Sequence, residues 1–323
     1  MSDSEEEEQV SVLIVVPSAP GPSTPLTESY TYHSPKPTAP GPYMLGVDEA
    51  GRGPVLGPLV YGVAYCPVAY KDQLEELGFA DSKTLTHEIR SSLLETLSSD
   101  PSNLAWSVEV LWYASPLSLT SLEHLLTNHF LSSSSYLFPS QDATIHLIRT
   151  VIASGIHLSE VYVDALGSTD KYQSYLSSLF PGIEFTVTQK ADSKFKIVGA
   201  ASVAAKVTRD ACIEGWYFEE DKPTTEGEPV ESKWSKGLGS GYPSDPNTVR
   251  WLKGAVDPVF GFPKLVRFSW TTVKVLLDKE ARGVKWTDEG QATLVKAFES
   301  GSGLDKDRSA VTRDLHLSSV SVL

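Results

Sequence analysis

The chain is poor in cysteine, in long hydrophobic runs and in basic residues, and each shortage excludes a class of protein. Only Cys66 and Cys212 are cysteines among 323 residues, too few for a disulfide framework, and no paired Cys/His spacing indicates zinc. No hydrophobic run approaches the ~20 residues of a membrane span. The acidic start MSDSEEEE has the wrong charge for a signal or transit peptide. We therefore expect an intracellular, reduced protein without a membrane segment.

Basic residues are outnumbered, with 27 Lys and Arg against 41 Asp and Glu and a net charge of −14. This balance argues against nucleic-acid binding through overall charge, so any such binding would need local basic patches. Two stretches are locally basic: residues 189–210 hold five bases and two acids, and residues 233–253 hold four bases and one acid. A solvated helix face is the common explanation of such runs, but they also fit contacts to phosphates.

The remaining composition supports a sizeable core, because 41% of the residues are hydrophobic. Residues 1–42 are rich in Ser, Pro, Glu and Thr without periodicity, so we predict a disordered tail, either inert or a docking segment. Residues 43–282 carry alternating strand and helix patterns and predict one α/β domain. Residues 283–323 form a C-terminal extension with a weak helical pattern at 288–298.

Local patterns predict five strands, at residues 45–49, 59–65, 106–111, 160–166 and 185–189. Helical patterns cover residues 70–79, 87–97, 119–131, 142–154 and 197–218, with more helical sequence to about 280. The short connection between the first two strands predicts antiparallel neighbours, and the later alternation with helices predicts a mixed sheet.

Four acids stand at or near the ends of predicted strands, namely Asp48, Glu49, Asp164 and Asp192. Ligands of α/β sheets commonly collect at strand ends, and oxygen donors without His or Cys suit Mg²⁺ or Mn²⁺ rather than zinc. Two such ions about 4 Å apart can activate a water and stabilise the leaving oxygen of a phosphodiester. Taken alone, Asp164 fits structural pairing or exposure equally well, and Asp192 reads more simply as a turn acid before a helix.

The Gly51–Gly57 loop follows the first two acids and leaves two questions open. Successive strand residues point to opposite faces, so Asp48 and Glu49 share a site only if the backbone turns at Ala50-Gly51. The loop lacks GxGxxG spacing and the chain has no GxxxxGK[ST], which argues against a nucleotide cofactor. An ordinary structural turn remains the alternative.

Six motifs resemble type 2 ribonuclease H in spacing and order. They are DEAGRGP at 48–54, DSKTL at 81–85, VDALG at 163–167, KAD at 190–192, AASVAAKVTRD at 200–210 and GSGYPSDP at 239–246. The resemblance covers about residues 44–280. The last motif, with VFGFPKLVRFSW at 259–270, is similar to the archaeal and eukaryotic branch, and the long tails favour the catalytic subunit of the eukaryotic enzyme.

This resemblance implies a ribonuclease-H-like fold, a mixed five-stranded sheet flanked by helices with a helical C-terminal extension. It also implies hydrolysis of the RNA strand of RNA–DNA hybrids, and cutting 5′ of single ribonucleotides embedded in duplex DNA. Removal of misincorporated ribonucleotides and of replication primers would place the protein in the nucleus. By motif position, the catalytic and metal-binding residues for two Mg²⁺ or Mn²⁺ ions are Asp48, Glu49, Asp164 and Asp192.

The resemblance also assigns substrate contacts and partners. The backbone of Gly51, Arg52 and Gly53 would read the ribose 2′-hydroxyl, Lys83 would contact a phosphate, and Tyr242 would stack on the sugar at the RNA–DNA junction. Two non-catalytic protein subunits are expected, with residues 283–323 as the docking segment. Residues 127–140 depart from the family pattern, which leaves contacts to the DNA strand there undetermined. The alternatives are a structure-specific DNA nuclease of the same fold and a catalytically silent scaffold that binds hybrids.

Overall fold

The computed structural model describes residues 16–20, 24–79, 85–112, 137–165, 167–218, 232–235 and 237–282, with side chains in the helix at 137–153 described from residue 143. The chain divides into two compact units, residues 1–282 and 283–323, and every described residue belongs to the first. Lys83 and the helices predicted at 119–131 and 288–298 lie outside the described residues. Within the described part, no helix has the length and apolar character needed to cross a membrane.

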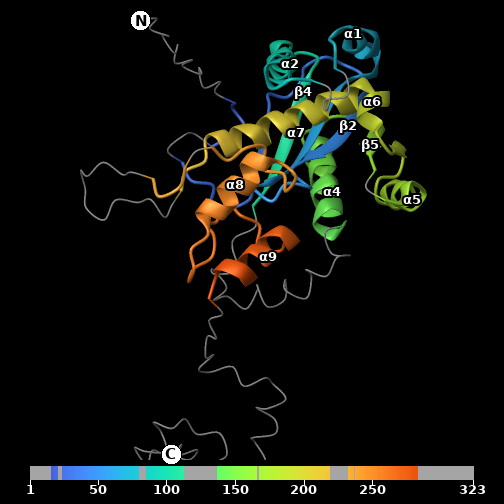
Figure 1. Cartoon of the computed structure of the whole chain (residues 1–323). Helices are drawn as coiled ribbons and strands as arrows, with labels where there is room; N and C mark the ends of the chain where they lie inside the picture. Colours follow the sequence, from blue (N-terminus) through green and yellow to red (C-terminus); the bar gives the residue numbers. More distant parts are fainter. Residues whose placement is uncertain are drawn as a thin grey trace, which may run out of the picture. The chain divides into compact units, whose positions relative to one another are not determined.

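Among the described residues, six strands form one mixed sheet in the order β1-β4-β3-β2-β5-β6, and helix α7, Lys196–Glu214, runs across this sheet (Figure 1). The strands are β1 Tyr30–His33, β2 Tyr43–Ala50, β3 Leu59–Pro67, β4 Ala105–Leu111, β5 Leu158–Asp164 and β6 Glu184–Thr188. Neighbours from β1 to β2 are antiparallel, whereas β2, β5 and β6 are parallel. The predictions of a mixed sheet and of an antiparallel first pair are confirmed.

The strand that the sequence did not predict is β1, which lies inside the segment predicted to be disordered. β1 pairs with β4 from Tyr30↔Val110 to His33↔Ser107, so the prediction of disorder is wrong for this part of residues 1–42, and the sheet has six strands rather than five. The Pro- and Ser-rich composition of the segment hid the short β-forming run Tyr30–His33. Such a run becomes a strand only because the edge of β4 is open to pair with it.

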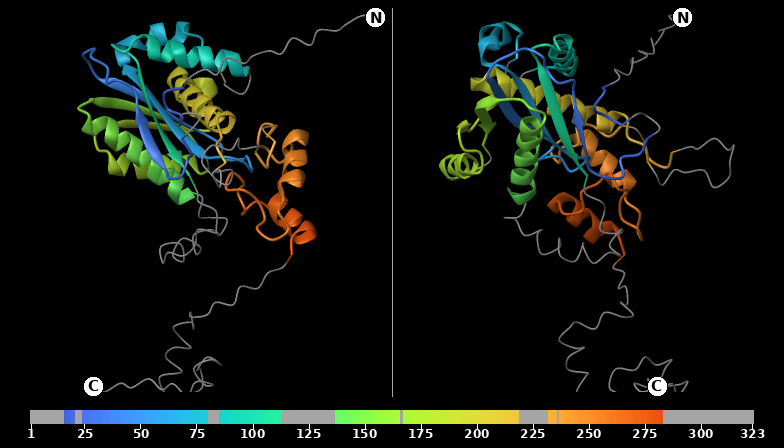
Figure 2. Two further views of the ribbon diagram at one scale, coloured as in Figure 1. Left: turned by 90° about the vertical axis from the view of Figure 1, so that its left-hand side faces the viewer. Right: turned by 180° about the vertical axis from the view of Figure 1, so that it is seen from behind.

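Helices cover both faces of the sheet (Figure 2). They are α1 Lys71–Glu76, α2 His87–Ser99, α4 Leu137–Ala153, α5 Thr169–Leu179, α6 Ala191–Lys194, α7 Lys196–Glu214, α8 Pro246–Ala255 and α9 Thr271–Glu280, with a 3₁₀ turn at Val68–Tyr70. α1, α2 and α7 pack on one face, and α4 and α5 on the other. α8 and α9 build a third hydrophobic cluster with the end of α7. The sequence did not predict α5, in which only Leu176 is buried.

The sheet and α7 approach each other unusually closely, because glycines and alanines line their contact. A Cβ atom on Gly46 of β2 would collide with the backbone carbonyl of Ile197, and one on Gly62 of β3 would lie 2.6 Å from the carbonyl oxygen of Ala201. Glycine in a strand interior often marks such a close backbone approach. As a result, Ser202 and Lys206 of α7 lie close to Asp48 near the end of β2.

Candidate active site

Asp48 and Asp164 lie just past the last paired residues of the neighbouring parallel strands β2 and β5. Val47 of β2 pairs with Val163 of β5, so Asp48 and Asp164 are the next residues on each strand, at the carboxyl end of the parallel pair. Strand alternation directs Asp48 to the α7 face, on which Met44 and Ala50 also pack. Asp48 is 5% exposed, and both acids line one pocket with an empty volume of about 1470 Å³, part of it open to solvent.

Glu49 lines the same pocket although the strand does not bend between the two acids. β2 stays paired with β3 through Glu49↔Tyr61 and Ala50↔Val60, so alternation sends the side chains of Asp48 and Glu49 to opposite faces. The turn begins only at Gly51, whose φ is +87°. Because β2 ends there, the pocket at the end of the sheet is lined by both side chains.

The crowding of carboxylates changes their proton affinities. Burial raises the pKa of Asp48 to about 6, against the opposing charge of Lys206 and a hydrogen bond with Ser202. Burial, followed by the charge of Asp48, raises the pKa of Glu49 to about 8. Lys206 Nζ in turn donates to Ser202 Oγ at 2.8 Å. Perturbed carboxylates that share a pocket are a common mark of a functional site.

Asp192 lies behind Asp164 rather than on the pocket wall. The chain leaves β6 through Lys190, a non-glycine residue with a left-handed φ of +54°, and enters α6. The backbone N–H of Ala191 then donates to Asp164 Oδ1 at 2.9 Å. Asp192 is 2% exposed, and its Oδ1 accepts from the N–H of Ser193 at 3.0 Å. The structure therefore brings Asp48, Glu49 and Asp164 into one pocket, with Asp192 buried next to it through Ala191.

The donor chemistry of these acids fits a hard divalent cation, since carboxylate oxygens are the ligands that Mg²⁺ and Mn²⁺ prefer. As the side chains stand, no three His, Cys, Asp or Glu residues in the described part of the chain are close enough together to hold an ion. The fit rests on the shared pocket and on the raised pKa values of Asp48 and Glu49. A bound cation would lower those pKa values.

The loop after β2 and Tyr242 form another wall of the pocket. Gly51, Arg52 and Gly53 line it together with Tyr242, whose side chain is 45% exposed. A Cβ atom on Gly53 would lie 3.1 Å from Cε1 of Tyr242, so the glycine lets the ring pack directly against the loop. Three residues that the sequence predicts to contact the ribose therefore lie beside the residue predicted to stack on the next sugar.

Comparison with known proteins identifies the family. Residues 45–273 match the family model of ribonuclease HII. The chain belongs to the ribonuclease HII family. It is 44% identical over 269 residues to a ribonuclease H2 subunit from Arabidopsis thaliana, covering 83% of this chain and 82% of that one. The corresponding human protein is 41% identical over 267 residues, with coverage of 82% and 80%. The crystal structure of ribonuclease H2 from Pyrococcus horikoshii OT3 matches with a TM-score of 0.51 and 30% identity, over 73% of this chain and 98% of that one.

Family membership makes the chain a ribonuclease, an enzyme that hydrolyses phosphodiester bonds, and confirms the resemblance to type 2 ribonuclease H. The α/β fold with its flanking helices is likewise that of the family. The roles of individual site residues stay predictions.

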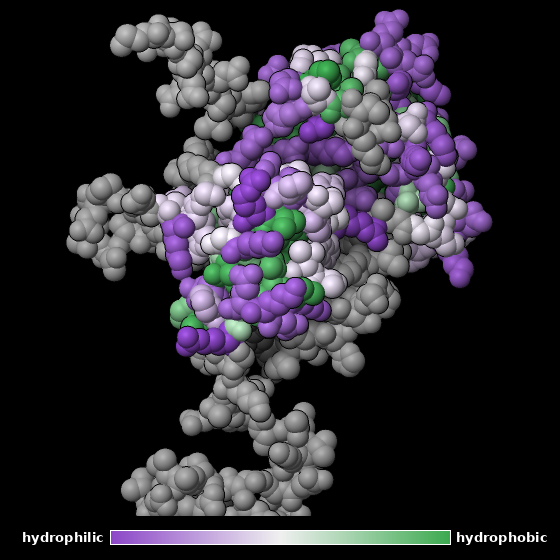
Figure 3. Space-filling model, in the orientation of Figure 1, coloured by the Kyte–Doolittle hydropathy of each residue, from purple (hydrophilic) through white to green (hydrophobic). Residues whose placement is uncertain are grey.

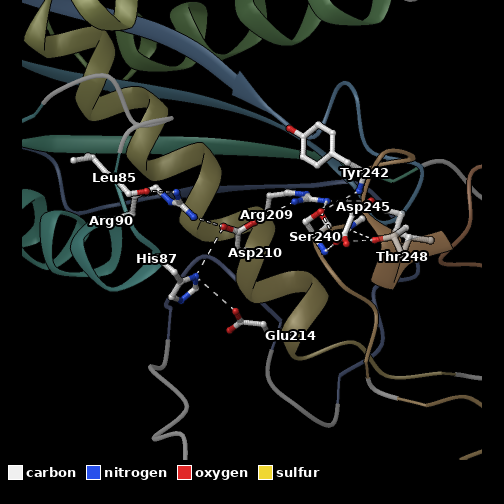
Figure 4. A network of polar contacts seen from close by, with 12 residues as sticks. Leu85, His87, Arg90, Arg209, Asp210, Glu214, Ser240, Tyr242, Asp245 and Thr248 are labelled. Atoms are coloured by element: carbon white, nitrogen blue, oxygen red, sulfur yellow. Dashed lines mark hydrogen bonds and ion pairs between the residues drawn. The ribbon is translucent and has the colours of Figure 1, made fainter. Parts of the chain in front are cut away.

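This ribonuclease also has a polar network at the pocket rim that sequence patterns did not reveal (Figure 4). Asp210 Oδ2 accepts from Arg90 Nη2, and Asp210 Oδ1 accepts from Arg209 Nη1, both at 3.2 Å. Arg90 Nη1 donates to the carbonyl of Leu85 at 2.8 Å, and Arg209 Nη2 donates to the carbonyl of Ser240 at 3.2 Å. Asp210 thus links the segment after the DSK motif to the loop that carries Tyr242.

One signal in the sequence could have found half of this network. Ser202, Lys206, Arg209 and Asp210 recur at helical spacing on α7, which places their side chains along neighbouring rows of one helix. His87 Nδ1 lies 3.7 Å from Glu214 Oε1 at the same rim. For residues of α2 the sequence holds no comparable signal, because their proximity to α7 depends on helix packing.

Proposed function

We propose that this ribonuclease hydrolyses the RNA strand of RNA–DNA hybrids and cuts 5′ of single ribonucleotides embedded in duplex DNA, with two Mg²⁺ or Mn²⁺ ions. The observation that carries the proposal is one pocket lined by Asp48, Glu49 and Asp164 on one side and by the Gly51–Gly53 loop on the other. Carboxylate oxygens that can bind cations lie beside a glycine-containing loop that a sugar could approach closely. This arrangement suits a phosphodiester bond next to a ribose.

Four acids would hold the ions: Asp48, Glu49 and Asp164 from the pocket wall, and Asp192 from behind it. Bound divalent cations supply an activated water and stabilisation of the leaving oxygen. Burial raises the pKa of Asp48 and the charge of Lys206 opposes that rise, so Lys206 favours the ionised carboxylate that a cation needs. Its contact with Ser202 at 2.8 Å holds the ammonium beside the acids.

Discrimination of RNA from DNA would come from the loop, because the two differ by one hydroxyl that a closely approaching backbone can test. The exposed ring of Tyr242, packed against Gly53, is suited to stack on the neighbouring deoxyribose. Lys83 would add a phosphate contact. Phosphate contacts orient a duplex without reading its bases, so we expect little sequence preference.

We also infer that the chain acts with two non-catalytic protein subunits in the nucleus, where misincorporated ribonucleotides and replication primers are removed. The relatives are named as subunits of ribonuclease H2, and residues 283–323 are the proposed docking segment. Within the first unit, Val259, Phe260 and Val275 are exposed, Phe260 by 64%, which also supports a partner surface. Figure 3 shows a hydrophobic area in the region of α8 and α9 on an otherwise largely hydrophilic face. Exposed hydrophobic patches often mark protein interfaces.

The test is Mg²⁺-dependent cleavage of a duplex that carries one ribonucleotide, with and without partner chains. We predict that Asp48→Asn abolishes cleavage but leaves folding and hybrid binding intact, because it removes a cation ligand from a surface that otherwise stays unchanged. Asp170→Asn, at an acid of α5 outside the pocket wall, is the control and should cut normally.

Two outcomes would favour the alternatives. Cleavage of an all-DNA duplex as fast as the hybrid would indicate a DNA nuclease of the same fold. Hybrid binding without any turnover in the full assembly would indicate a scaffold. Substantial turnover by purified Asp48→Asn would contradict the assignment of Asp48.

A further inference from the structure

The backbone of the loop after β2 is held by a segment more than two hundred residues away. The N–H of Arg267 donates to the carbonyl of Val55 at 2.9 Å, and the N–H of Gly57 donates to the carbonyl of Leu265 at 3.0 Å. Arg267 Nε donates to the carbonyl of Gly57 at 2.8 Å. Residues 265–270 therefore hold the backbone of the second half of the loop, residues 55–57, in place.

The first half of the loop, residues 51–53, lines the pocket and is held by a side chain of the same segment. Trp270 Nε1 donates to the carbonyl of Gly53 at 3.1 Å. Trp270 occupies the N-cap position of α9, where its backbone carbonyl accepts from the N–H groups of Val273 and Lys274, both at 3.0 Å. The guanidinium of Arg267 lies 5.7 Å from the centre of the Trp270 ring. Gly53 thus has the indole N–H on its carbonyl and the ring of Tyr242 against its Cα.

We propose that Trp270 is a positioning residue for ribose recognition. This inference rests on the proposed function, in which the backbone of Gly51–Gly53 reads the 2′-hydroxyl. Glycine is permissive in φ and ψ, so a loop with two glycines would sample many peptide orientations unless its carbonyls were held. The indole N–H holds the Gly53 carbonyl, and through it the peptide groups that face the sugar, in one orientation before substrate arrives. Such preorganisation raises the affinity of the group that is recognised.

The test compares Trp270→Phe, which removes the N–H and keeps an aromatic ring, with a matched control. Trp251 Nε1 donates to the carbonyl of Ser235 at 2.8 Å, so Trp251→Phe removes the same kind of bond outside the pocket wall. For each full-length protein, dissociation constants are measured for two duplexes that differ only by one 2′-hydroxyl, with Ca²⁺ in place of Mg²⁺ to prevent cutting. The deciding quantity is the ratio of the two constants.

We expect Trp270→Phe to lower the preference for the ribonucleotide duplex at least about fivefold, the effect of one hydrogen bond of ordinary strength, and Trp251→Phe to leave it unchanged. A general loss of folded protein weakens the binding of both duplexes equally and does not change the ratio of the two dissociation constants. If Phe at 270 prevents folding, the isosteric 3-benzothienylalanine, which has sulfur in place of N–H, takes its place.

An unchanged ratio in Trp270→Phe, or an equal loss in Trp251→Phe, would overturn the inference. A different failure belongs to the proposed function: a wild-type protein that binds both duplexes equally does not read the 2′-hydroxyl at all.

Discussion

At the scale of single residues, the main feature of this ribonuclease is a set of carboxylates that hold protons more tightly than usual. Asp48 and Glu49 are covalent neighbours on β2, and Asp164 lies beside Asp48 through the strand register. Burial and mutual repulsion raise the pKa of both Asp48 and Glu49. Such an arrangement destabilises the protein without a cation and favours binding of one.

Glu49 allows this to be measured as pH dependence. Its folded pKa of about 8 exceeds the ordinary value of 4.5, so the folded state keeps a proton that the unfolded chain releases. Without metal, the contribution of Glu49 to stability is therefore complete below about pH 4.5 and is lost as pH rises through 8. We predict that, in EDTA, Glu49→Gln is more stable than wild type by up to about 5 kcal/mol at pH 9 and equally stable at pH 4.

Thermal unfolding across this pH range, with EDTA or with Mg²⁺, checks the prediction. Added Mg²⁺ should stabilise wild type most at high pH and should stabilise the variant less. Parallel pH profiles of the two proteins in EDTA would contradict the assigned proton affinity.

Tyr242 is the second residue whose role can be isolated. We predict that Tyr242→Ala slows cutting at a single embedded ribonucleotide more than cutting within a long hybrid, because only the former presents a deoxyribose at the junction for the ring to contact. Tyr175→Ala on α5 is the matched control, since Tyr175 is 44% exposed and Tyr242 45%. Equal losses on the two substrates would remove Tyr242 from junction recognition.

At the scale of elements, α7 organises the site. It packs against β2 and β3 at Gly46 and Gly62, presents Ser202 and Lys206 to the acids, and carries Asp210 to the rim. Through Asp210 it holds α2, which begins four residues after Lys83. The arrangement of the segments that are proposed to bind substrate therefore depends on α7 and the residues that it contacts.

We predict that Asp210→Asn raises KM for a long hybrid several-fold with little change in kcat, because its effect falls on segments that bind the duplex and not on the acids. The weakened ion pairs should also cost about 1–3 kcal/mol of stability, the range for a partly buried charged hydrogen bond. Steady-state kinetics and thermal unfolding measure the two effects. Glu214→Gln is the control, since it changes an exposed contact with His87, and a fall in kcat without a change in KM would contradict the prediction.

At the scale of the whole molecule, an acidic protein is proposed to bind an acidic substrate. The net charge is −14, yet Arg52, Arg90, Lys206 and Arg209 line the pocket. Five acids line the same pocket, namely Asp48, Glu49, Asp164, Asp210 and Glu214. The basic side chains would therefore attract phosphates when bound cations offset these acids, and the attraction would weaken with salt. The exposed apolar side chains near α9 form a separate surface suited to protein partners.

We predict that removing residues 283–323 abolishes co-purification with partner chains and leaves thermal unfolding of residues 1–282 nearly unchanged, because the two parts are separate compact units. Phe260→Ser should weaken the same association, whereas Ile152→Ser, at an exposed side chain of α4, should not. Full association of the truncated chain would refute the docking role of the extension.

Much of this fold and site could be predicted from local sequence. Short apolar runs predict β2 and β5, and the acids near their ends, with the ordered motifs, indicate the family and its chemistry. Those signals are local, because side-chain periodicity and turn chemistry act within a few residues. Sequence patterns and motif positions also underlie two further predictions. These are the C-terminal boundary of the candidate catalytic domain and the roles of the acids.

Other features depended on the tertiary structure. Residues 30–33 become a strand only because β4 leaves an edge to pair with, and Asp48 lies beside Asp164 only through the register of β2 and β5. The bond from Trp270 to Gly53 and the link from Arg90 to Asp210 join segments far apart in the chain. Contacts of this kind follow from how sheet order and helix packing satisfy the whole core at once, and no local pattern of residues encodes them.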